Sequence, residues 1–572
     1  MINTRLAFIR VGYCWIPPIS HKLPQELSRY KGIKFTKQYS TSAGEFEVLL
    51  IVRKPDLTKL PVAYILRKPL ELQGKALPHI RNDGFLCYAS NDQAEWNPMV
   101  PFELAHAIDR SIKATLQSSI DNIDNSTEYN NEFSNYWESH FLAYSFEPLP
   151  TKSRRLKYCS LEAKTGSKSL PYTEFLLFNN DEERDRWLEL RNVKSIAEEG
   201  QAIIVNVKPN RWAPTEQWPP SSLAQTLNWL TYADRSAHDF LIFQLVQLAA
   251  RKALVILQIT NEGVLGFKIE FSAKHHKLLT TWKSRKTRSI KLMTVPISSP
   301  KAAMQFYRHR IEQIDRDSVF LRNRPDPNVG DIRHLRIALI GCGTIGGFVA
   351  EHLVKLGAGI GAQGNLTLYD SDDLNSGNLS RHRLPARYLG WNKADALSTM
   401  LSEDSLHPIK LSSKCEDFSI DVENLGKYDV VIDATGRSPV SLKIASTIRE
   451  MGEVSRPIVI HSFNDQWGQE SVVFIDAGKA CYGCMDKTAS ASHIEPDFDP
   501  SRYSCGSIYT PYDASVSIVS AGLVADAVLS VLEPKLKWTL TKVTSNNTNS
   551  QKRQILRPWS KCVICGERVK HG

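Results

Sequence analysis

The sequence predicts a multi-domain α/β protein: an N-terminal α+β block, a connecting block of mixed structure, and a C-terminal block with a parallel sheet covered by helices. Three observations lead to this prediction. The chain has 572 residues, more than one hydrophobic core usually serves. Short strands and longer helical stretches are mixed before residue 149, whereas buried strands alternate with helices from residue 319 onward. We place the domains at residues 1–148, 149–318 and 319–572.

The N-terminal block has two apolar stretches typical of strands, at residues 45–52 and 60–66. Apolar residues at helical spacing predict helices over residues 102–116 and 128–137. In the connecting block we expect two helices and two strands, and no residue pattern there is typical of an active site. The expected helices span residues 181–192 and 237–250, and the expected strands span 254–259 and 264–271.

The C-terminal block carries the clearest alternation. Strands are predicted at residues 336–340, 365–369, 429–432 and 457–460, and helices at 344–356 and 515–532. Since parallel strands expose their carboxyl ends at one edge of the sheet, residues that follow these strands should lie close together.

The composition excludes several classes of protein. Hydrophobic residues make up 42% and charged residues 23%, as in ordinary globular proteins, and no apolar run approaches the ~18 residues of a membrane span. We therefore predict no membrane segment, and we find no signal peptide at the N-terminus. The ten cysteines include two Cys-x-x-Cys pairs, which indicates metal binding in a reducing, cytoplasmic setting.

The net charge of +10 is densest in residues 274–291. We expect a solvated β-hairpin face there. The alternative is a dock for an acidic partner or nucleic acid, and nucleic acid is not favoured by the rest of the chain.

A glycine run lies between the first strand of the C-terminal block and its helix. Gly341, Gly343 and Gly346 would let backbone N–H groups and the helix N-terminus face phosphates. Asp370, which ends the second strand, could hold a ribose hydroxyl. This pattern alone fits NAD as well as ATP.

A polar and basic set distinguishes the two nucleotides. Asn378, Arg381 and Lys393 follow the second strand, and Asp433 ends the third. An enzyme that cleaves ATP between the α and β phosphates needs such cations, because charge builds on the phosphates. A carboxylate at the edge of the sheet suits Mg²⁺. A dehydrogenase has no use for this set.

These residues resemble the ubiquitin-activating superfamily, which includes the bacterial ThiF and MoeB adenylyltransferases with their Rossmann-like fold. The resemblance implies that Asp370 binds the ribose, that Asn378, Arg381 and Lys393 contact the phosphates, and that Asp433 handles Mg²⁺. It also implies a homodimer and an upstream arginine, Arg322 or Arg324, that reaches the ATP. One departure is His382, where many members carry glutamine.

The two cysteine pairs, Cys481 with Cys484 and Cys562 with Cys565, supply four soft ligands that suit a tetrahedral Zn²⁺ ion. A redox disulfide pair is the alternative. In the resembled family such a zinc ion is structural.

A further thiol, Cys505, lies between the pairs in a loop with glycine and proline nearby. A loop thiol can reach an acyl-adenylate, and the family's thioester cysteine lies in this interval. We therefore predict that Cys505 is catalytic. Four other cysteines, Cys14, Cys159, Cys342 and Cys415, are interpreted as structural.

The N-terminal block contains a second reactive thiol. Pro78-His79 and Gly84-Phe-Leu-Cys87 precede Trp96-Asn-Pro98 and a long amphipathic helix, a pattern that resembles ubiquitin-conjugating enzymes. The resemblance implies that Cys87 carries an acyl group. It departs where the family has asparagine, because Ile80 stands there; His79 or Asn82 are the candidate substitutes.

Together the two resemblances are to a bacterial fusion of ubiquitin-conjugating-like and ubiquitin-activating-like domains, as in CBASS antiphage operons. This implies a ligase that uses Mg-ATP to adenylate a protein's C-terminal carboxylate, captures it on Cys505, passes it to Cys87 and joins it to an acceptor amine. A cGAS-like nucleotidyltransferase is the implied substrate.

Two other classes remain open at this point: an enzyme for a separate ubiquitin-like protein or sulfur carrier, and a nucleotide-binding scaffold without activity.

Overall fold

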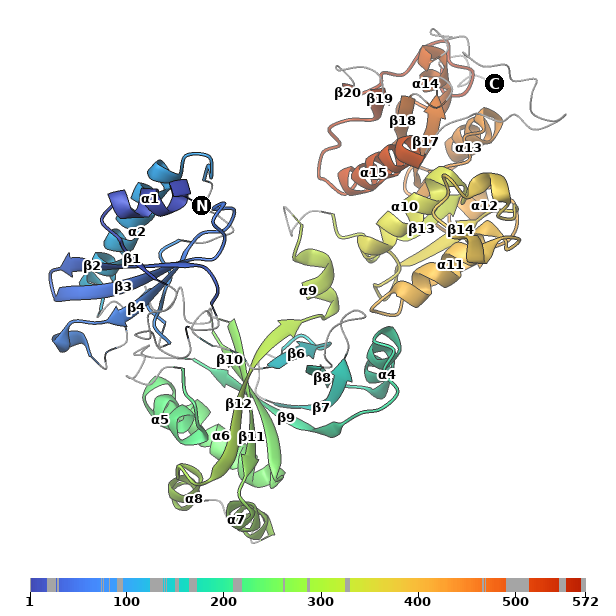
Figure 1. Ribbon diagram of the computed structural model, residues 1–572. Helices are drawn as coiled ribbons and strands as arrows, with labels where there is room; N and C mark the ends of the chain where they lie inside the picture. Colours follow the sequence, from blue (N-terminus) through green and yellow to red (C-terminus); the bar gives the residue numbers. More distant parts are fainter. Residues whose placement is uncertain are drawn as a thin grey trace. The chain divides into compact units, whose positions relative to one another are not determined.

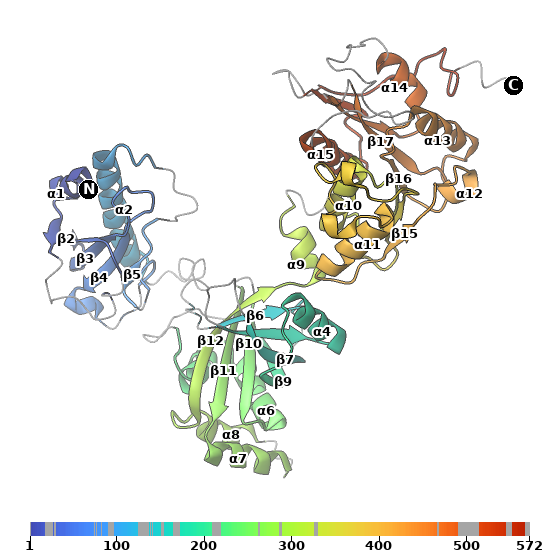
Figure 2. The same ribbon diagram turned by 45° about the vertical axis from the view of Figure 1, so that its right-hand side comes forward.

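The computed structural model divides the chain into two compact units, Met1–Ile314 and Asp315–Gly572. Figure 1 and Figure 2 give two views of the ribbon. The structure describes residues 2–17, 27, 30–73, 75, 77–81, 83–89, 96–123, 137, 139, 141–149, 154–163, 172–208, 219–260, 263–284, 289–324, 330–465, 468, 470–489, 514–544 and 552–566. Within these ranges no helix is both long and apolar enough to span a membrane.

The first unit begins with an antiparallel sheet backed by two helices. The sheet follows chain order: β1 (Cys14–Ile16), β2 (Ile33–Thr41), β3 (Gly44–Val52), β4 (Val62–Arg67) and β5 (Phe85–Leu86). Helices α1 (Ile2–Arg10) and α2 (Pro101–Asp121) pack their apolar sides onto alternate strand residues, which form one core. The predicted strands at 45–52 and 60–66 and the helix at 102–116 are confirmed. Of the helix predicted at 128–137, all but Trp137 lies outside the described residues.

This packing positions Cys87. Strand β5 pairs with β4 through Ala63 and Leu86, so the thiol directly follows the edge of the sheet. Leu86 is buried beneath it, whereas Cys87 is exposed. The site therefore stands on a rigid sheet while its sulfur remains accessible.

The connecting region of the first unit is a closed barrel, which the sequence did not predict. Its strands run in the order β10 (Lys252–Ile259), β11 (Gly263–Phe271), β12 (Ala303–Gln313), β6 (Phe141–Ser145), β8 (Tyr172–Phe178), β7 (Arg154–Ala163) and β9 (Glu198–Val207). The helices are α4 (Asp181–Leu190), α5 (Leu223–Ala233), α6 (Arg235–Leu248), α7 (Ala273–Ser284) and α8 (Ile290–Ile297). The expected strands at 254–259 and 264–271 and helices at 181–192 and 237–250 are confirmed within a few residues.

The β-hairpin expected in the basic stretch 274–291 is wrong. Residues 273–284 form helix α7 and residue 290 begins α8. Leu279 and Met293 are buried in the barrel core, while most of the lysines face solvent. The pairs Leu279/Trp282 and Ile290/Met293, each three residues apart within the core-facing sides of the two helices, were the helical signal that the hairpin prediction missed. In both views α7 and α8 lie together at one end of the barrel (Figures 1 and 2).

The second unit is built on one sheet in the order β15 (Leu411–Lys414), β14 (Asn365–Tyr369), β13 (Arg336–Ile340), β16 (Val430–Asp433), β17 (Ile458–Asp465), β18 (Glu470–Asp476), β19 (Leu540–Thr544) and β20 (Lys552–Gln554). Strands β15 to β17 are parallel, as predicted, and β18 to β20 continue the sheet antiparallel. The helices are α9 (Arg316–Leu321), α10 (Thr344–Lys355), α11 (Lys393–Asp404), α12 (Val422–Leu425), α13 (Ser438–Glu450), α14 (Tyr482–Ala489) and α15 (Ala514–Ser530).

The strand order reverses between β13 and β16. After β13 the chain moves to β14 on one side, and β16 lies on the other side. Ligands bind at such switch points, outside the carboxyl ends of the strands. The glycine loop follows β13, and Asp370 and Asp433 stand at the ends of β14 and β16, so the sheet brings all three to this edge.

Candidate functional sites

The glycine loop is held tightly against the sheet. Gly341 has a φ of 86° and donates its N–H to the Tyr369 carbonyl at 2.8 Å. A Cβ at Gly346 would lie 1.9 Å from the Gly341 carbonyl oxygen, so only glycine fits there. At Gly343, which precedes α10, a Cβ would meet nothing within 4 Å. The loop is therefore open at the N-terminus of α10, where a phosphate would approach.

The Asp370 carboxylate binds both the glycine loop and the residues that follow β14. It accepts the N–H of Cys342 at 2.6 Å and that of Asp372 at 2.8 Å. Burial raises the pKa of Asp370 above its usual 3.8. The Asn392 amide donates to the Asp370 carbonyl at 2.8 Å, and its oxygen caps α11. Asn392, which the sequence reasoning missed, thus fixes the start of the helix that carries Lys393.

Lys393 forms an uneven ion pair. Its ammonium lies 2.9 Å from an Asp372 carboxylate oxygen, but the lysine side chain is 8% exposed and the aspartate side chain 74%. The Lys393 side chain is therefore buried at the edge of the sheet, whereas the Asp372 side chain faces solvent. A phosphate could therefore replace Asp372 without moving the lysine.

Asn378 and Arg381 lie in the short turn after Asp370. The Asn378 side-chain oxygen accepts the Asn375 N–H at 3.1 Å in a capping box, and both Asn378 and Arg381 are half-buried. The next residue, His382, is buried, and this burial lowers its pKa to about 4. His382 is therefore neutral. Its Nε2–H donates to the Cys342 carbonyl at 2.8 Å, and this bond holds the glycine loop in place.

Asp433 is surrounded by donors. One oxygen accepts the N–H and hydroxyl of Thr435, at 3.1 and 2.7 Å. The other accepts the Ser441 hydroxyl and lies 2.9 Å from His461 Nδ1. Burial pushes the pKa of Asp433 up, but the bonds from His461, Ser441 and Thr435 outweigh it and hold the pKa below 3.8. All four lone-pair directions of the carboxylate are taken by protein donors.

The same turn touches the glycine loop. A Cβ at Gly341 would lie 3.1 Å from the Ala434 carbonyl and from Thr435 Cα. Asp433 thus positions the turn that packs on the loop, and binding Mg²⁺ would require it to give up a protein donor. Ser441 and His461 were missed by the sequence reasoning because they lie on other elements, α13 and β17, and no local pattern marks them as donors to Asp433.

The two candidate arginines differ in placement. Arg324 donates Nη2 to the Leu356 carbonyl at 3.2 Å, beyond the last residue of α10 and at the opposite end of that helix from the glycine loop. Burial lowers its pKa. Arg322 follows α9 and is exposed. Of the two residues, Arg322 is the more exposed.

The four predicted metal ligands come together. All the sulfurs of Cys481, Cys484, Cys562 and Cys565 lie within 4.8 Å of one another. The Cys481–Cys562, Cys484–Cys565 and Cys481–Cys484 sulfur distances are 3.4, 3.3 and 3.8 Å. Zinc–sulfur bonds of about 2.3 Å in a tetrahedron place sulfurs about 3.8 Å apart, so the donor set fits Zn²⁺. The backbone N–H of Trp559 also donates to the Cys484 sulfur at 3.3 Å, a bond that helps to orient this cysteine.

Cys87 stands on a strained turn. Its N–H donates to the His79 carbonyl at 2.8 Å, and His79 has a φ of 62°, which is unusual for a residue with a side chain. On the other side, the Tyr88 hydroxyl donates to the Pro61 carbonyl at 2.6 Å, and the Ser111 hydroxyl of α2 donates to the Tyr88 carbonyl at 2.6 Å. The backbone around the thiol is thus held from both sides.

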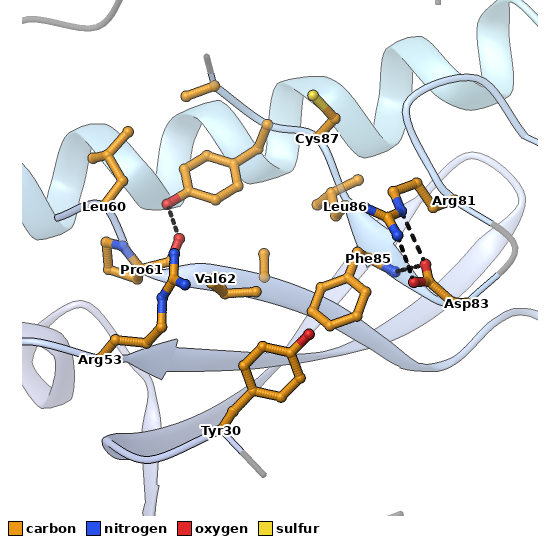
Figure 3. A pocket seen from close by; sticks show the side chains of 13 residues that line it. Tyr30, Arg53, Leu60, Pro61, Val62, Arg81, Asp83, Phe85, Leu86 and Cys87 are labelled. Atoms are coloured by element: carbon orange, nitrogen blue, oxygen red, sulfur yellow. Dashed lines mark hydrogen bonds and ion pairs between the residues drawn. The ribbon is translucent and has the colours of Figure 1, made fainter. Parts of the chain in front are cut away.

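A pocket of about 330 Å³ lies beside Cys87 (Figure 3). It is lined by Tyr30, Arg53, Leu60, Pro61, Val62, Ala63, Arg81, Asp83, Phe85, Leu86, Cys87, Tyr88 and Ala89. Asn82, one candidate substitute for the family's asparagine, lies outside the described residues, as does Cys505. Of the cysteines interpreted as structural, Cys159 and Cys342 are buried, and Cys14 and Cys415 are exposed.

Two family models match the chain, one for each site. The model of the ThiF family matches residues 316–564. The model of prokaryotic E2 family B matches residues 18–145, which include Cys87. The two sites therefore belong to separately recognisable domains of one chain.

Curated relatives match almost the whole length. The ATP-dependent ubiquitin transferase-like protein Cap2 of Vibrio cholerae is 35% identical over 559 residues, covering 94% of this chain and 95% of its own. The protein of the same name from Escherichia coli is 34% identical, covering 93% of each. Among solved structures, that of E. coli MccB is similar at 20% identity and a TM-score of 0.33, covering 42% of this chain and 67% of its own.

Proposed function

The chain belongs to the family of ATP-dependent ubiquitin transferase-like proteins named Cap2, and we propose that it activates a protein's C-terminal carboxylate at the glycine loop and conjugates it through Cys87. It is a fusion of a ubiquitin-conjugating-like domain with a ThiF adenylation domain, and it is an activating and conjugating ligase. The finer assignments, including the domain limits 1–148, 149–318 and 319–572, are part of the proposal.

One observation carries the proposal. The glycine loop, the Asp370 carboxylate and the buried Lys393 ammonium meet at one edge of a parallel sheet, and the same chain holds an exposed thiol with its own pocket. The first arrangement suits nucleotide phosphates, and the second suits an acyl carrier.

In the activation step, an oxygen of the substrate carboxylate attacks the α-phosphorus of ATP and pyrophosphate leaves. Lys393 and Arg381 would stabilise the charge that develops on the phosphates. Gly341, Gly343 and Gly346 would cradle the phosphates through backbone N–H groups, Asn378 would donate to them, and Asp370 would accept from the ribose.

Two metal ions at two separate sites are part of the proposal. Mg²⁺ supplies charge neutralisation at the phosphates when bound, and Asp433 is its proposed ligand, provided that a donor such as Thr435 turns away. Zn²⁺ would be held by Cys481, Cys484, Cys562 and Cys565, where it would tie the C-terminal segment to the start of α14.

In the transfer steps, the Cys505 thiolate attacks the carbonyl of the acyl-adenylate and AMP leaves. The Cys87 thiolate then attacks the thioester carbonyl, and the Cys505 thiolate departs. An amine of the acceptor protein takes the acyl group from Cys87. Joining both thiols in one chain raises their effective concentration and favours this relay.

The proposed substrate is the C-terminus of a cGAS-like nucleotidyltransferase, and the setting is cytoplasmic antiphage defence. We further propose a homodimer in which Arg322 or Arg324 reaches the ATP. Arg322 is the more exposed of the two, and Arg324 donates to the Leu356 carbonyl. A separate ubiquitin-like protein is the alternative substrate; a neighbouring small gene product ending in Gly-Gly would favour it.

Intact-mass spectrometry without reductant tests the relay. The wild-type chain and its Cys87→Ala and Cys505→Ala variants would be incubated with Mg-ATP and a candidate nucleotidyltransferase. We expect a thiol-labile adduct on Cys87 that is absent in Cys505→Ala and an adduct held on Cys505 in Cys87→Ala. Loading of Cys87 in the Cys505→Ala protein would contradict the proposed order.

A further inference from the structure

The pocket beside Cys87 carries a charge that its described lining does not neutralise. Arg81 pairs with Asp83, with Nη2 to Oδ2 at 2.8 Å and Nε to Oδ1 at 3.2 Å. Arg53 also lines the pocket and is exposed, and no acidic residue in the described part of the chain forms an ion pair with it. Figure 3 shows Arg53 on the side of the pocket opposite the Arg81–Asp83 pair. The described lining of the pocket, with Arg53, Arg81 and Asp83 as its charged residues, therefore has a net positive charge.

The rest of the lining is apolar and firmly supported. The Phe85 ring lies 5.4 Å from the Tyr30 ring and 5.2 Å from the Tyr64 ring, measured between centroids. The Arg81 guanidinium lies 5.5 Å above Phe85. A volume of about 330 Å³ is at the lower end of the range for ligand sites. The pocket is thus suited to a few side chains that include at least one carboxylate.

On the basis of the proposed acyl transfer, we propose that this pocket binds the residues that precede the acyl carbon on Cys87, and that Arg53 selects a donor segment carrying an acidic side chain. Cys87 is itself one of the lining residues, so an attached acyl group delivers its own segment to the pocket. An extended residue spans about 3.3–3.6 Å, so the second or third residue of the segment lies within reach.

The positive charge of the pocket disfavours binding of the acceptor lysine. An acceptor lysine would meet Arg53 and the Arg81 guanidinium, and like charges disfavour such an approach. The Asp83 carboxylate offers little compensation, because it is paired with Arg81 and also accepts the Phe85 N–H at 3.4 Å. The acyl donor is therefore the occupant that fits this pocket.

Peptide thioesters test the inference without ATP. Short peptides ending in glycine are made as thioesters of 2-mercaptoethanesulfonate, with glutamate, glutamine or lysine near the glycine. The Cys87 thiolate attacks the carbonyl carbon, the new carbon–sulfur bond forms, and mercaptoethanesulfonate leaves as the thiolate. The full-length Cys505→Ala chain is used, and rates are read by intact mass. Loading of the exposed Cys14 and Cys415 is subtracted by means of the Cys87→Ala/Cys505→Ala chain.

We expect the glutamate peptide to load about two- to fivefold faster than the lysine peptide, the effect of one partly exposed ion pair. Arg53→Gln should abolish this preference, Arg53→Glu should reverse it, and Arg53→Lys should keep it. Lys54→Glu is the matched control, because it reverses an exposed charge one residue away that does not line the pocket. It should leave the preference for glutamate intact.

Equal rates for all peptides in the unmodified pocket would overturn the inference, as would a preference that survives Arg53→Gln. Neither result would contradict the proposed transfer of the acyl group from Cys505 to Cys87. If no peptide loads Cys87 while Cys505 is loaded in the Cys87→Ala chain, the proposed role of Cys87 fails, and the pocket assignment fails with it.

Discussion

The two regions that we propose to be reactive, the glycine loop and the surroundings of Cys87, hold their charges in opposite ways. At the glycine loop, the Lys393 side chain is 8% exposed and already paired with Asp372, and Asp433 is buried among four donors. Around Cys87, the thiol is exposed, and Arg53 forms no ion pair with the described part of the chain. The charged groups at the glycine loop are thus already held by protein contacts, whereas the surroundings of Cys87 have a fixed backbone and an accessible thiol.

The difference follows from what each reaction needs. Stabilising charge on phosphates depends on donors and cations fixed in advance, because reorganisation at the moment of reaction is costly. Passing an acyl group between thiols and an amine depends instead on access for large partners. The comparison therefore predicts that changes at the first region alter stability and activation together, whereas changes at the second alter transfer with little effect on stability.

The largest effect is expected at the metal cluster. Cys481→Ser should reduce zinc from about one ion per chain to about none, and should lower the unfolding free energy of the second unit by on the order of 5 kcal/mol. Elemental analysis and calorimetry measure both. Cys415→Ser, at an exposed cysteine outside the cluster, is the control. Undiminished zinc in the Cys481→Ser chain would contradict the assignment.

Lys393→Ala should lower ATP–pyrophosphate exchange about 100- to 1000-fold, the usual cost of losing one preorganised donor. Loading of Cys87 from a peptide thioester should not change. Lys355→Ala serves as control, since that side chain is 69% exposed near the end of α10. Exchange within a few-fold of the unmodified chain would break the comparison.

Asp433→Asn should destabilise the second unit by about 2–3 kcal/mol at neutral pH, because one carboxylate oxygen is replaced by an NH2 group that cannot accept from the buried donors facing it. The pKa of Asp433 is held below 3.8 in the folded chain, so the carboxylate contributes stability above that value and loses it as pH falls through the folded pKa. The difference from Asp433→Asn should therefore shrink below about pH 4.

Calorimetry across pH, with the exposed Asp404→Asn as control, measures this dependence. A stability difference that grows on acidification would show that the hydrogen bonds to Asp433 do not stabilise its charged form.

The smallest effect is expected at His79. Its φ of 62° suits glycine, so His79→Gly should change the stability of the first unit by less than about 1 kcal/mol, whereas the β-branched His79→Val should cost about 1–2 kcal/mol. Thermal unfolding of the full chain gives these values. A large loss in His79→Gly would show that the imidazole, rather than the turn, stabilises this region.

Local sequence patterns predicted the elements whose contacting residues are also close together in the sequence. The strand at 365–369, the loop at Gly341–Gly346 and α10 were predicted because glycine spacing and apolar runs are local signals. The four cysteines were also predicted as a group, and the structure brings them together.

The barrel and the supporting contacts could not be predicted in this way. Strand β12 has no regular alternation, because half-buried and exposed residues follow one another irregularly and only His309 is buried. Its pairing with β6 joins positions more than a hundred residues apart. Likewise, nothing in sequence marks His461 and Ser441 as donors to Asp433, since each lies on a different element. Arg53 lines the pocket of Cys87 only through the pairing of the sheet.

The central claim is that activation and transfer are separate tasks of one chain. The most direct test compares ATP–pyrophosphate exchange with conjugate formation in the Cys87→Ala chain, using Mg-ATP, a candidate nucleotidyltransferase and a lysine-bearing acceptor. We predict unchanged exchange and no conjugate. Loss of exchange together with conjugation, or conjugates that persist without Cys87, would contradict the division of labour between the two regions.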